Sequence, residues 1–145
     1  MQRDNAPGLA WMQMLEPPRV AIPKLEVRLV PARPGVYAWF SASEPIYAGK
    51  ASGRGGLRER IGKHLEVGPD LSRSSLRRNV AEYVLGVPTA VSRQRPSVMP
   101  PEQISRINEW IRELEVAWLE YPTPGEAVEF ERDLLREWMP PLSKR

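Results

Sequence analysis

Two kinds of side chain are missing or nearly missing from this sequence, and their scarcity restricts the chemistry it can perform. The 145 residues include no cysteine and a single histidine, His64. Without cysteine there is no disulfide, no thiolate zinc site and no cysteine nucleophile. One histidine also argues against a histidine-rich metal site and against a Ser-His-Asp triad. Any metal would rest on oxygen ligands, which favours a hard cation such as Mg²⁺ or Mn²⁺.

Long hydrophobic runs are absent as well. No apolar stretch approaches the roughly 20 residues that span a membrane, and residues 1–8 lack the basic start and apolar run of a signal peptide. The lack of cysteine suits a reducing compartment. We therefore expect a cytoplasmic protein with no membrane segment. Its composition, 41% hydrophobic and 27% charged, is ordinary for one globular domain.

The basic residues are distributed unevenly along the chain. The formal net charge is only +3, but residues 50–95 hold ten Lys or Arg against four Asp or Glu. The remainder holds eleven basic against fourteen acidic residues, and 17 of all 21 basic residues are arginine. Arginine binds phosphate oxygens through two parallel hydrogen bonds. The basic segment therefore indicates a nucleic-acid contact, with a solvated basic face as the alternative.

Proline and hydrophobic periodicity divide the chain into elements. Residues 1–24 hold four prolines and no regular period, which predicts an extended or partly ordered N-terminal arm with one short turn around residues 11–15. Strand-forming composition or alternation predicts strands at 25–30, 36–40, 45–49 and 116–121. Helical spacing predicts helices at 57–65, 75–85, 101–114 and 126–138, and residues 87–99 form a loop in this prediction. We expect one α+β domain over residues 25–145 with a small, mostly antiparallel β-sheet flanked by helices.

The last predicted helix carries a carboxylate in an apolar setting. On a helical wheel, Glu131 falls within the stripe formed by its apolar residues, which are Ala127, Val128, Phe130, Leu134, Leu135 and Trp138. A buried carboxylate is costly unless it is paired, protonated, hydrogen-bonded or bound to a metal. Glu131 is thus a candidate metal ligand or catalytic residue. A buried salt bridge to one of the arginines, or a wet stripe edge, would explain it equally.

Two further pairs are candidates on weaker grounds. Arg60 and His64 are four residues apart, so they project side by side at the rim of the 57–65 helix. A rim arginine can reach a phosphate while its stem packs, although it can equally be an ordinary surface side chain. Tyr37 and Tyr47 stand on the two strands of the predicted hairpin. Tyrosines there are usually core aromatics whose hydroxyl reaches water.

These separate features match the pattern of one known family. Gly35-Val36-Tyr37, then nine residues, then Tyr47-Ala48-Gly49-Lys50 resembles the two short motifs that name the GIY-YIG nucleases. The run 46–51 looks most like the N-terminal nuclease domain of the bacterial nucleotide-excision repair incision subunit. Leu57-Arg58-Glu59-Arg60 resembles the family's arginine helix, with His64 one turn later. The final helix resembles the one whose single glutamate holds the metal.

The resemblance implies a function and a role for each candidate. It implies an endonuclease that hydrolyses DNA phosphodiesters with one Mg²⁺ or Mn²⁺, RNA being a further possible substrate. Glu131 would hold the metal, Arg60 would stabilise the transition state, and Tyr37 or Tyr47 would orient the attacking water or take its proton. His64 would relay a proton or bind phosphate. Backbone phosphates would be contacted by Lys50, Arg73, Arg77 and Arg78, and a protein partner could supply targeting.

The sequence departs from the family pattern in two places. The family's closing segment often has asparagine where this chain has Ser143, so we expect the hydrogen bond of that asparagine to be lost or bridged by water. An insertion of two helices is also expected at about residues 66–114. It would contact the substrate backbone or serve only as scaffold. The alternative to a nuclease is a nucleic-acid-binding module that kept the fold without cleaving.

Overall fold

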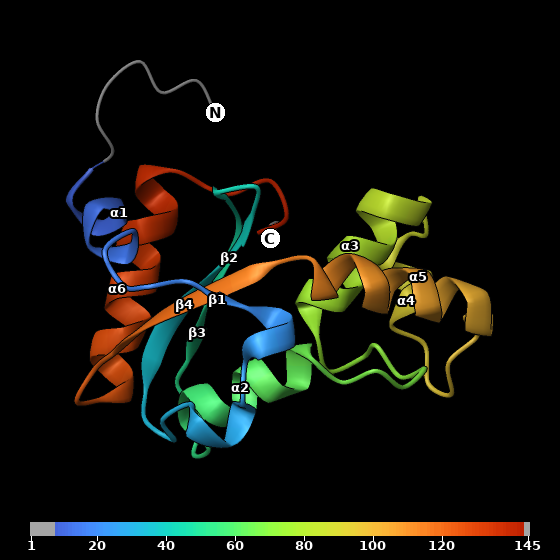
Figure 1. The fold of residues 1–145 in the computed structure, drawn as a ribbon, viewed down its shortest axis with the longest axis horizontal. Helices are drawn as coiled ribbons and strands as arrows, with labels where there is room; N and C mark the ends of the chain where they lie inside the picture. Colours follow the sequence, from blue (N-terminus) through green and yellow to red (C-terminus); the bar gives the residue numbers. More distant parts are fainter. Residues whose placement is uncertain (1–7, 144–145) are drawn as a thin grey trace.

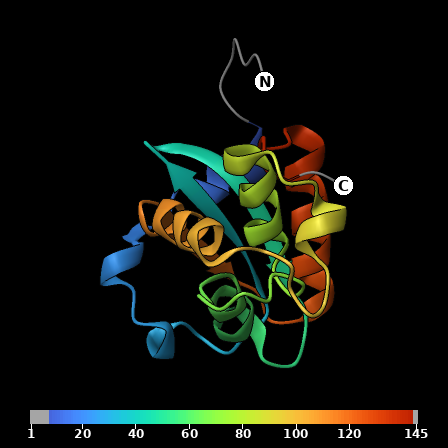
Figure 2. The same ribbon diagram turned by 90° about the vertical axis from the view of Figure 1, so that its right-hand side faces the viewer.

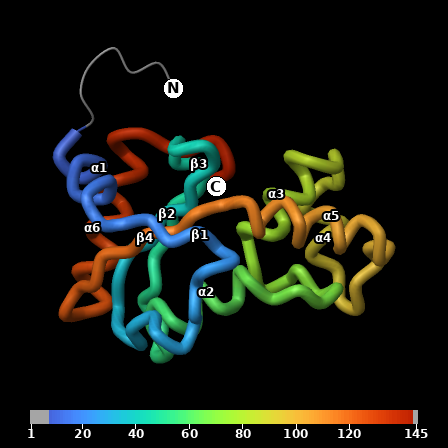
Figure 3. Tube along the Cα trace, viewed as in Figure 1, coloured from blue at the N-terminus to red at the C-terminus, as the bar shows by residue number. Residues whose placement is uncertain are grey.

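The computed structural model describes residues 8–143, which form a small sheet with helices around it (Figures 1 and 3). In chain order the elements are α1 (Leu9–Met14), β1 (Val20–Ala21), the 3₁₀ turns η1 (Ile22–Lys24) and η2 (Val27–Leu29), β2 (Gly35–Ser41), β3 (Glu44–Ala51), α2 (Gly56–His64), α3 (Ser75–Leu85), α4 (Thr89–Ser92), α5 (Pro101–Arg112), β4 (Glu115–Glu120) and α6 (Pro124–Glu137).

The four strands form one antiparallel sheet in the order β1-β4-β2-β3, which confirms the predicted α+β class. Strands β2 and β3 form the predicted hairpin, with Tyr37 opposite Gly49 and Trp39 opposite Tyr47. The two turn residues, Ala42 and Ser43, both have positive φ, as a tight hairpin turn requires. This register places Tyr37, Trp39 and Tyr47 on the same face of the sheet.

The two faces of the sheet are covered by different helices. Val36, Ala38 and Phe40 pack with buried residues of α1 and α6. The opposite face, with both tyrosines, packs with buried residues of α2, α3 and α5. Figure 1 shows α1 and α6 on one side of the sheet and α3, α4 and α5 on the other, and Figure 2 shows those three helices toward the viewer.

The insertion packs against the domain and contains one element more than predicted. The helices expected at 75–85 and 101–114 are present as α3 and α5, and Gly86 ends α3 in the left-handed conformation that glycine favours. Within the expected loop, α4 forms a single helical turn that closes with buried Ser92. The sequence predicted two inserted helices, and the structure has a third, the single turn α4.

The N-terminal part differs most from the prediction. A short turn was predicted around residues 11–15, and the structure has the helix α1 there. The chain is not extended at this point, because α1 packs on α6 with Trp11 and Met14 fully buried. The indole Nε1 of Trp11 donates hydrogen bonds to the carbonyl oxygens of Leu134, at 2.9 Å, and Trp138, at 3.0 Å. Within the rest of the predicted arm, residues 20–24 form β1 and η1, and residues 1–7 lie outside the described residues.

The strand expected at 25–30 is not formed. Val20 and Ala21 pair with Val116 and Glu115 of β4 instead, and β4 has β2 on its other side. Part of the 25–30 segment forms η2, which leaves Leu29 64% exposed. The alternation of apolar residues in the sequence therefore did not correspond to one buried face. Among residues 8–143, no helix is long and apolar enough to cross a membrane.

We predict that Trp11→Ala lowers the free energy of unfolding by about 3–5 kcal/mol, because it removes a fully buried aromatic ring and two hydrogen bonds. Urea unfolding measures this change. Met12→Ala, at a half-exposed position in the same helix, is the control and should change stability by less than about 0.5 kcal/mol. If Trp11→Ala lowered the free energy of unfolding by no more than Met12→Ala, α1 would not contribute to the core.

Candidate active site

A chain of hydrogen bonds links the sheet, α2 and the start of α3. The hydroxyl of Tyr37 lies 2.7 Å from Nε2 of His64, and Nδ1 of His64 lies 2.7 Å from the hydroxyl of Ser74. The Ser74 hydroxyl also accepts the backbone N–H of Arg77 and so caps α3. All three linked side chains are buried. The ring of Tyr47 stands edge-on to His64, with centroids 5.7 Å apart.

Burial keeps His64 neutral. Loss of hydration holds the pKa of His64 well below its ordinary value of 6.5, and the positive charges of Arg60 and Arg78 lower it further. A neutral imidazole carries one proton and so donates one hydrogen bond and accepts one. His64 therefore donates toward one of its two neighbours, Tyr37 or Ser74, and accepts from the other.

Tyr47 is held by the insertion. Its hydroxyl forms a short hydrogen bond with the hydroxyl of Ser75, at the start of α3. Burial raises the pKa of Tyr47, while the Ser75 hydrogen bond and the charges of Arg60 and Arg78 act in the opposite direction. Burial also raises the pKa of Tyr37, well above its ordinary value, with further increases from Tyr47 and Glu131 against the charge of Arg60. The charges of Arg60 and Glu131 therefore act on both tyrosines.

Gly49 allows Tyr37 to take this position. A Cβ atom on Gly49 would lie 2.6 Å from the Tyr37 hydroxyl and 2.8 Å from its ring carbon Cζ. Because that hydroxyl is buried and bonded to His64, it has no room to move away. Gly49, the glycine of the second motif, is therefore needed for the close approach of Tyr37, the tyrosine of the first motif.

Arg60 lies where α2 borders a pocket. The pocket is lined by residues at the end of β3 and the start of α2, namely Lys50, Ala51, Ser52, Gly53, Gly56, Glu59 and Arg60. The guanidinium of Arg60 donates a hydrogen bond to the carbonyl of Arg73 at 3.2 Å. Arg60 is only partly buried, so it combines a fixed orientation with access to solvent. This combination suits contact with an anionic ligand.

Glu131 is buried in α6 as the helical wheel predicted, with 6% of its surface exposed. Its Oε1 lies 3.6 Å from Nζ of Lys50, on the edge strand β3. The carboxylate thus has a cationic neighbour, Lys50. The sequence left open a salt bridge between Glu131 and an arginine. The structure has a salt bridge in that place, but with Lys50.

The carboxylate chemistry of the site suits a hard cation held by one protein ligand. Glu131 supplies an oxygen of the kind that Mg²⁺ and Mn²⁺ prefer. Among residues 8–143, no cluster of three or more His, Asp or Glu side chains could hold a metal ion. Water and substrate oxygens would have to complete the coordination. Magnesium commonly keeps several waters and binds through one or two carboxylates.

The C-terminal segment closes the edge of β3. The hydroxyl of Ser143 accepts the N–H of Ala48 at 2.8 Å and donates to the carbonyl of the same residue at 3.2 Å. The N–H of Leu142 donates to the carbonyl of Ile46, and the side-chain amide of Asn79 donates to the carbonyl of Leu142. Serine at position 143 therefore makes direct hydrogen bonds to the second motif. The expectation about the asparagine's own hydrogen bond stays a prediction.

The predicted nucleic-acid contacts fall into different environments. Arg73 is exposed and Lys50 is partly exposed. Arg78 is partly buried, and its NH1 donates to the carbonyls of Leu71 and Ser72. Arg77 is fully buried, and its guanidinium donates hydrogen bonds to Gly68, Asp70 and Asn108. The prediction of a backbone contact by Arg77 is therefore wrong, because this side chain ties α3 to α5.

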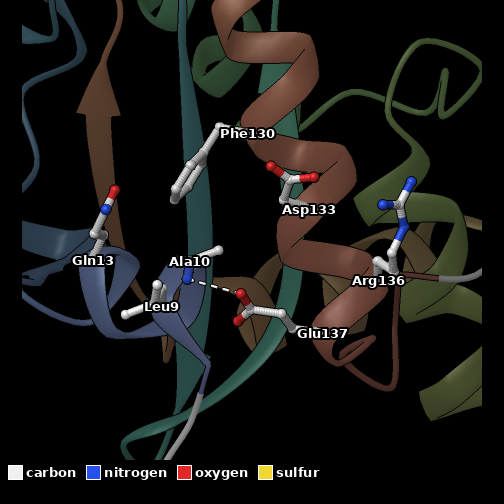
Figure 4. Close-up of a pocket in the computed structure, with 7 residues that line it drawn as sticks. All are labelled: Leu9, Ala10, Gln13, Phe130, Asp133, Arg136 and Glu137. Atoms are coloured by element: carbon white, nitrogen blue, oxygen red, sulfur yellow. Dashed lines mark hydrogen bonds between the residues drawn. The ribbon is translucent and has the colours of Figure 1, made fainter.

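A second pocket lies away from these groups, between α1 and α6 (Figure 4). Glu137 fixes that junction, since its carboxylate accepts the backbone N–H groups of Ala10 and Trp11. These are the first N–H groups of a helix, which have no partner within the helix itself. The role of Glu137 is therefore structural.

Sequence reasoning missed Ser74 and Ser75 as parts of the site. The sequence placed them only at the start of a predicted helix, and Ser74 is the cap of α3. Nothing in the local sequence indicates that their hydroxyls meet His64 and Tyr47, which lie 10 and 28 residues away in the chain. Only the folding of the insertion onto α2 and β3 brings them together.

Comparison with protein families gives a match for this chain. Residues 35–145 match the family described as the GIY-YIG catalytic domain, which covers more than half of the chain. The chain belongs to the GIY-YIG family. The family is one of nucleases, and the match begins at the first glycine of the first motif and includes the last helix. Neither curated proteins nor solved structures gave a match. The likeness to the repair subunit stays a prediction.

We predict that stability depends on the protonation of His64. Because its pKa is lowered by folding, the unfolded chain takes up a proton first as the pH falls below about 6.5. The stabilising contribution is present above that pH and is lost as the pH falls, by up to about 1.4 kcal/mol per pH unit. Urea unfolding between pH 7 and 5.5 should show this slope, and His64→Gln should flatten it. Equal slopes in the two proteins would contradict a buried neutral His64.

Proposed function

We propose that this protein is a metal-dependent endonuclease that hydrolyses phosphodiester bonds in DNA. The observation that supports this most is a set of neighbouring groups: the rings of Tyr37 and Tyr47 lie 6.5 Å apart, and Lys50, 3.6 Å from Glu131, lines the same pocket as Arg60. These side chains come from β2, β3, α2 and α6. A scaffold alone has no need for a buried carboxylate next to a lysine that lines a pocket with a solvent-accessible arginine.

Glu131 is the residue that would hold Mg²⁺ or Mn²⁺ in this proposal. When bound, such an ion supplies Lewis-acid neutralisation of the charge on a phosphodiester. Lys50, 3.6 Å from Glu131, balances the carboxylate in the free protein and is free to turn toward a phosphate oxygen. Its flexible stem and partial exposure permit this movement.

Arg60 would stabilise the additional negative charge that develops on the phosphate in the transition state. The carbonyl of Arg73 holds one of its nitrogen atoms, and other N–H groups of the guanidinium remain to face the pocket. A guanidinium with a fixed orientation loses little freedom when it binds an anion. This would make Arg60 effective in the chemical step as well as in binding.

The tyrosines would orient the attacking water or take its proton. If Ser74 donates its hydroxyl hydrogen to Nδ1 of His64, the neutral ring carries its proton on Nε2 and donates to the oxygen of Tyr37. The hydroxyl hydrogen of Tyr37 is then directed away from His64. His64 would thus set the direction of the Tyr37 hydroxyl rather than contact the phosphate itself.

The second candidate function is a binding module that has lost cleavage. The substitution at Ser143 was its main support in the sequence. That support is reduced, since Ser143 makes two hydrogen bonds to the strand that carries Tyr47. DNA as substrate rests on the family likeness and on the arginine-rich segment. Parallel assays on supercoiled plasmid and on structured RNA distinguish these polymers.

We predict that the protein nicks supercoiled plasmid in the presence of Mg²⁺ or Mn²⁺ and that chelation by EDTA stops the reaction. Glu131→Gln should abolish nicking while leaving DNA binding at low salt intact, because the amide keeps the volume and loses the charge. Glu129→Gln, exposed on the same helix, is the matched control and should cleave like the wild type. Binding without metal-dependent cleavage in the wild-type protein would support the binding module instead.

We further predict that Arg60→Ala lowers the rate constant of cleavage about 100-fold or more, the usual effect of removing a donor that faces developing charge. Single-turnover measurements at saturating protein separate this effect from binding. Arg106→Ala, which removes an exposed arginine on α5, should cleave like the wild type. A loss of affinity with an unchanged rate constant would limit Arg60 to binding.

A further inference from the structure

Five consecutive residues at the start of the insertion each contact a side chain of the candidate site. Carbonyl oxygens of Leu71 and Ser72 accept hydrogen bonds from Arg78, and the carbonyl of Arg73 accepts one from Arg60. The next two residues contribute their hydroxyls, Ser74 to His64 and Ser75 to Tyr47. We name residues 71–75 the positioning segment.

The segment is itself held rigidly. Leu71 is fully buried in the core, and the hydroxyl of Ser74 caps α3. Arg77 anchors the preceding loop through the carbonyls of Gly68 and Asp70 and reaches α5 through Asn108. A segment with these anchors can fix the orientation of the groups that it contacts. A loop that merely connects two helices does not need such contacts.

From these contacts we propose that the positioning segment is a working part of the active site, and that Ser75 is a positioning residue for Tyr47. This inference rests on the proposed nuclease function, which gives Tyr47 a role in catalysis. It resolves the alternatives left open for the insertion, because the insertion would orient the groups that act on the substrate. Without residues 66–114, the domain would keep its motifs, but the side chains of the site would no longer be held in their orientation.

Ser75 offers a clean substitution. The cap of α3 is provided by Ser74, so Ser75→Ala removes the contact to Tyr47 and leaves the cap of the helix in place. Ser75→Thr keeps the hydroxyl and tests whether that group alone matters. Ser105→Ala, an exposed serine on α5, is the matched control.

The first measurement does not depend on activity. Tyrosine labelled with ¹³C at Cζ gives one NMR signal for each of the four tyrosines, and Tyr47→Phe assigns the signal of Tyr47. We expect Ser75→Ala to shift the Tyr47 signal and to leave those of Tyr83 and Tyr121 in place. Ser75→Thr should restore the wild-type position, and Ser105→Ala should change nothing. An unmoved Tyr47 signal in folded Ser75→Ala would overturn the proposal.

The second measurement uses cleavage. Ser75→Ala should lower kcat about tenfold with little change in KM, the size expected for one oriented hydrogen bond, and Ser75→Thr should recover most of the rate. An unchanged kcat in a cleaving protein would overturn the positioning role. If the wild-type protein does not cleave at all, the proposed function fails, and the NMR signal still decides whether Ser75 holds Tyr47.

Discussion

The hydrogen bond between Tyr37 and His64 is the constraint on which the rest of the site depends. It joins the central strand β2 to α2. The other ring nitrogen of His64 is hydrogen-bonded to Ser74 at the start of α3. Because the three groups are buried, each must find its partner inside the protein, and an unpaired member would cost about 1–3 kcal/mol. This requirement fixes α2 and the insertion relative to the sheet. Arg60, four residues before His64, is placed by the same helix.

The edge strand β3 is the second place where separate parts of the chain meet. Its tyrosine faces α2 and α3, its lysine reaches Glu131 on α6, and its outer backbone groups bond to Ser143. An exposed edge normally invites pairing with other strands. Here the C-terminal segment covers part of that edge and fixes the strand that carries the second motif. The fold and the site thus use the same contacts.

Much of the fold could be predicted from the sequence because its signals were local. Glu131 was identified by helical spacing alone, and the hairpin was identified by its two short strands. Leu25–Val30 did not form the predicted strand, and Val20 and Ala21 pair with β4 instead, which no local pattern reveals. The burial of Arg77 and the contacts of Ser74 and Ser75 depend on how the insertion packs. Local periodicity contains no information about such partners.

We propose that Tyr37, Tyr47, Arg60 and Glu131 act on one phosphodiester. The decisive measurement is a crystal structure of Glu131→Gln bound to a short DNA duplex with Mn²⁺. We expect a phosphate within hydrogen-bond reach of Arg60, beside Tyr47 and position 131, with the strand passing the pocket between β3 and α2. DNA bound only on the outer face of α3 and α5, with no phosphate near Arg60, would contradict it.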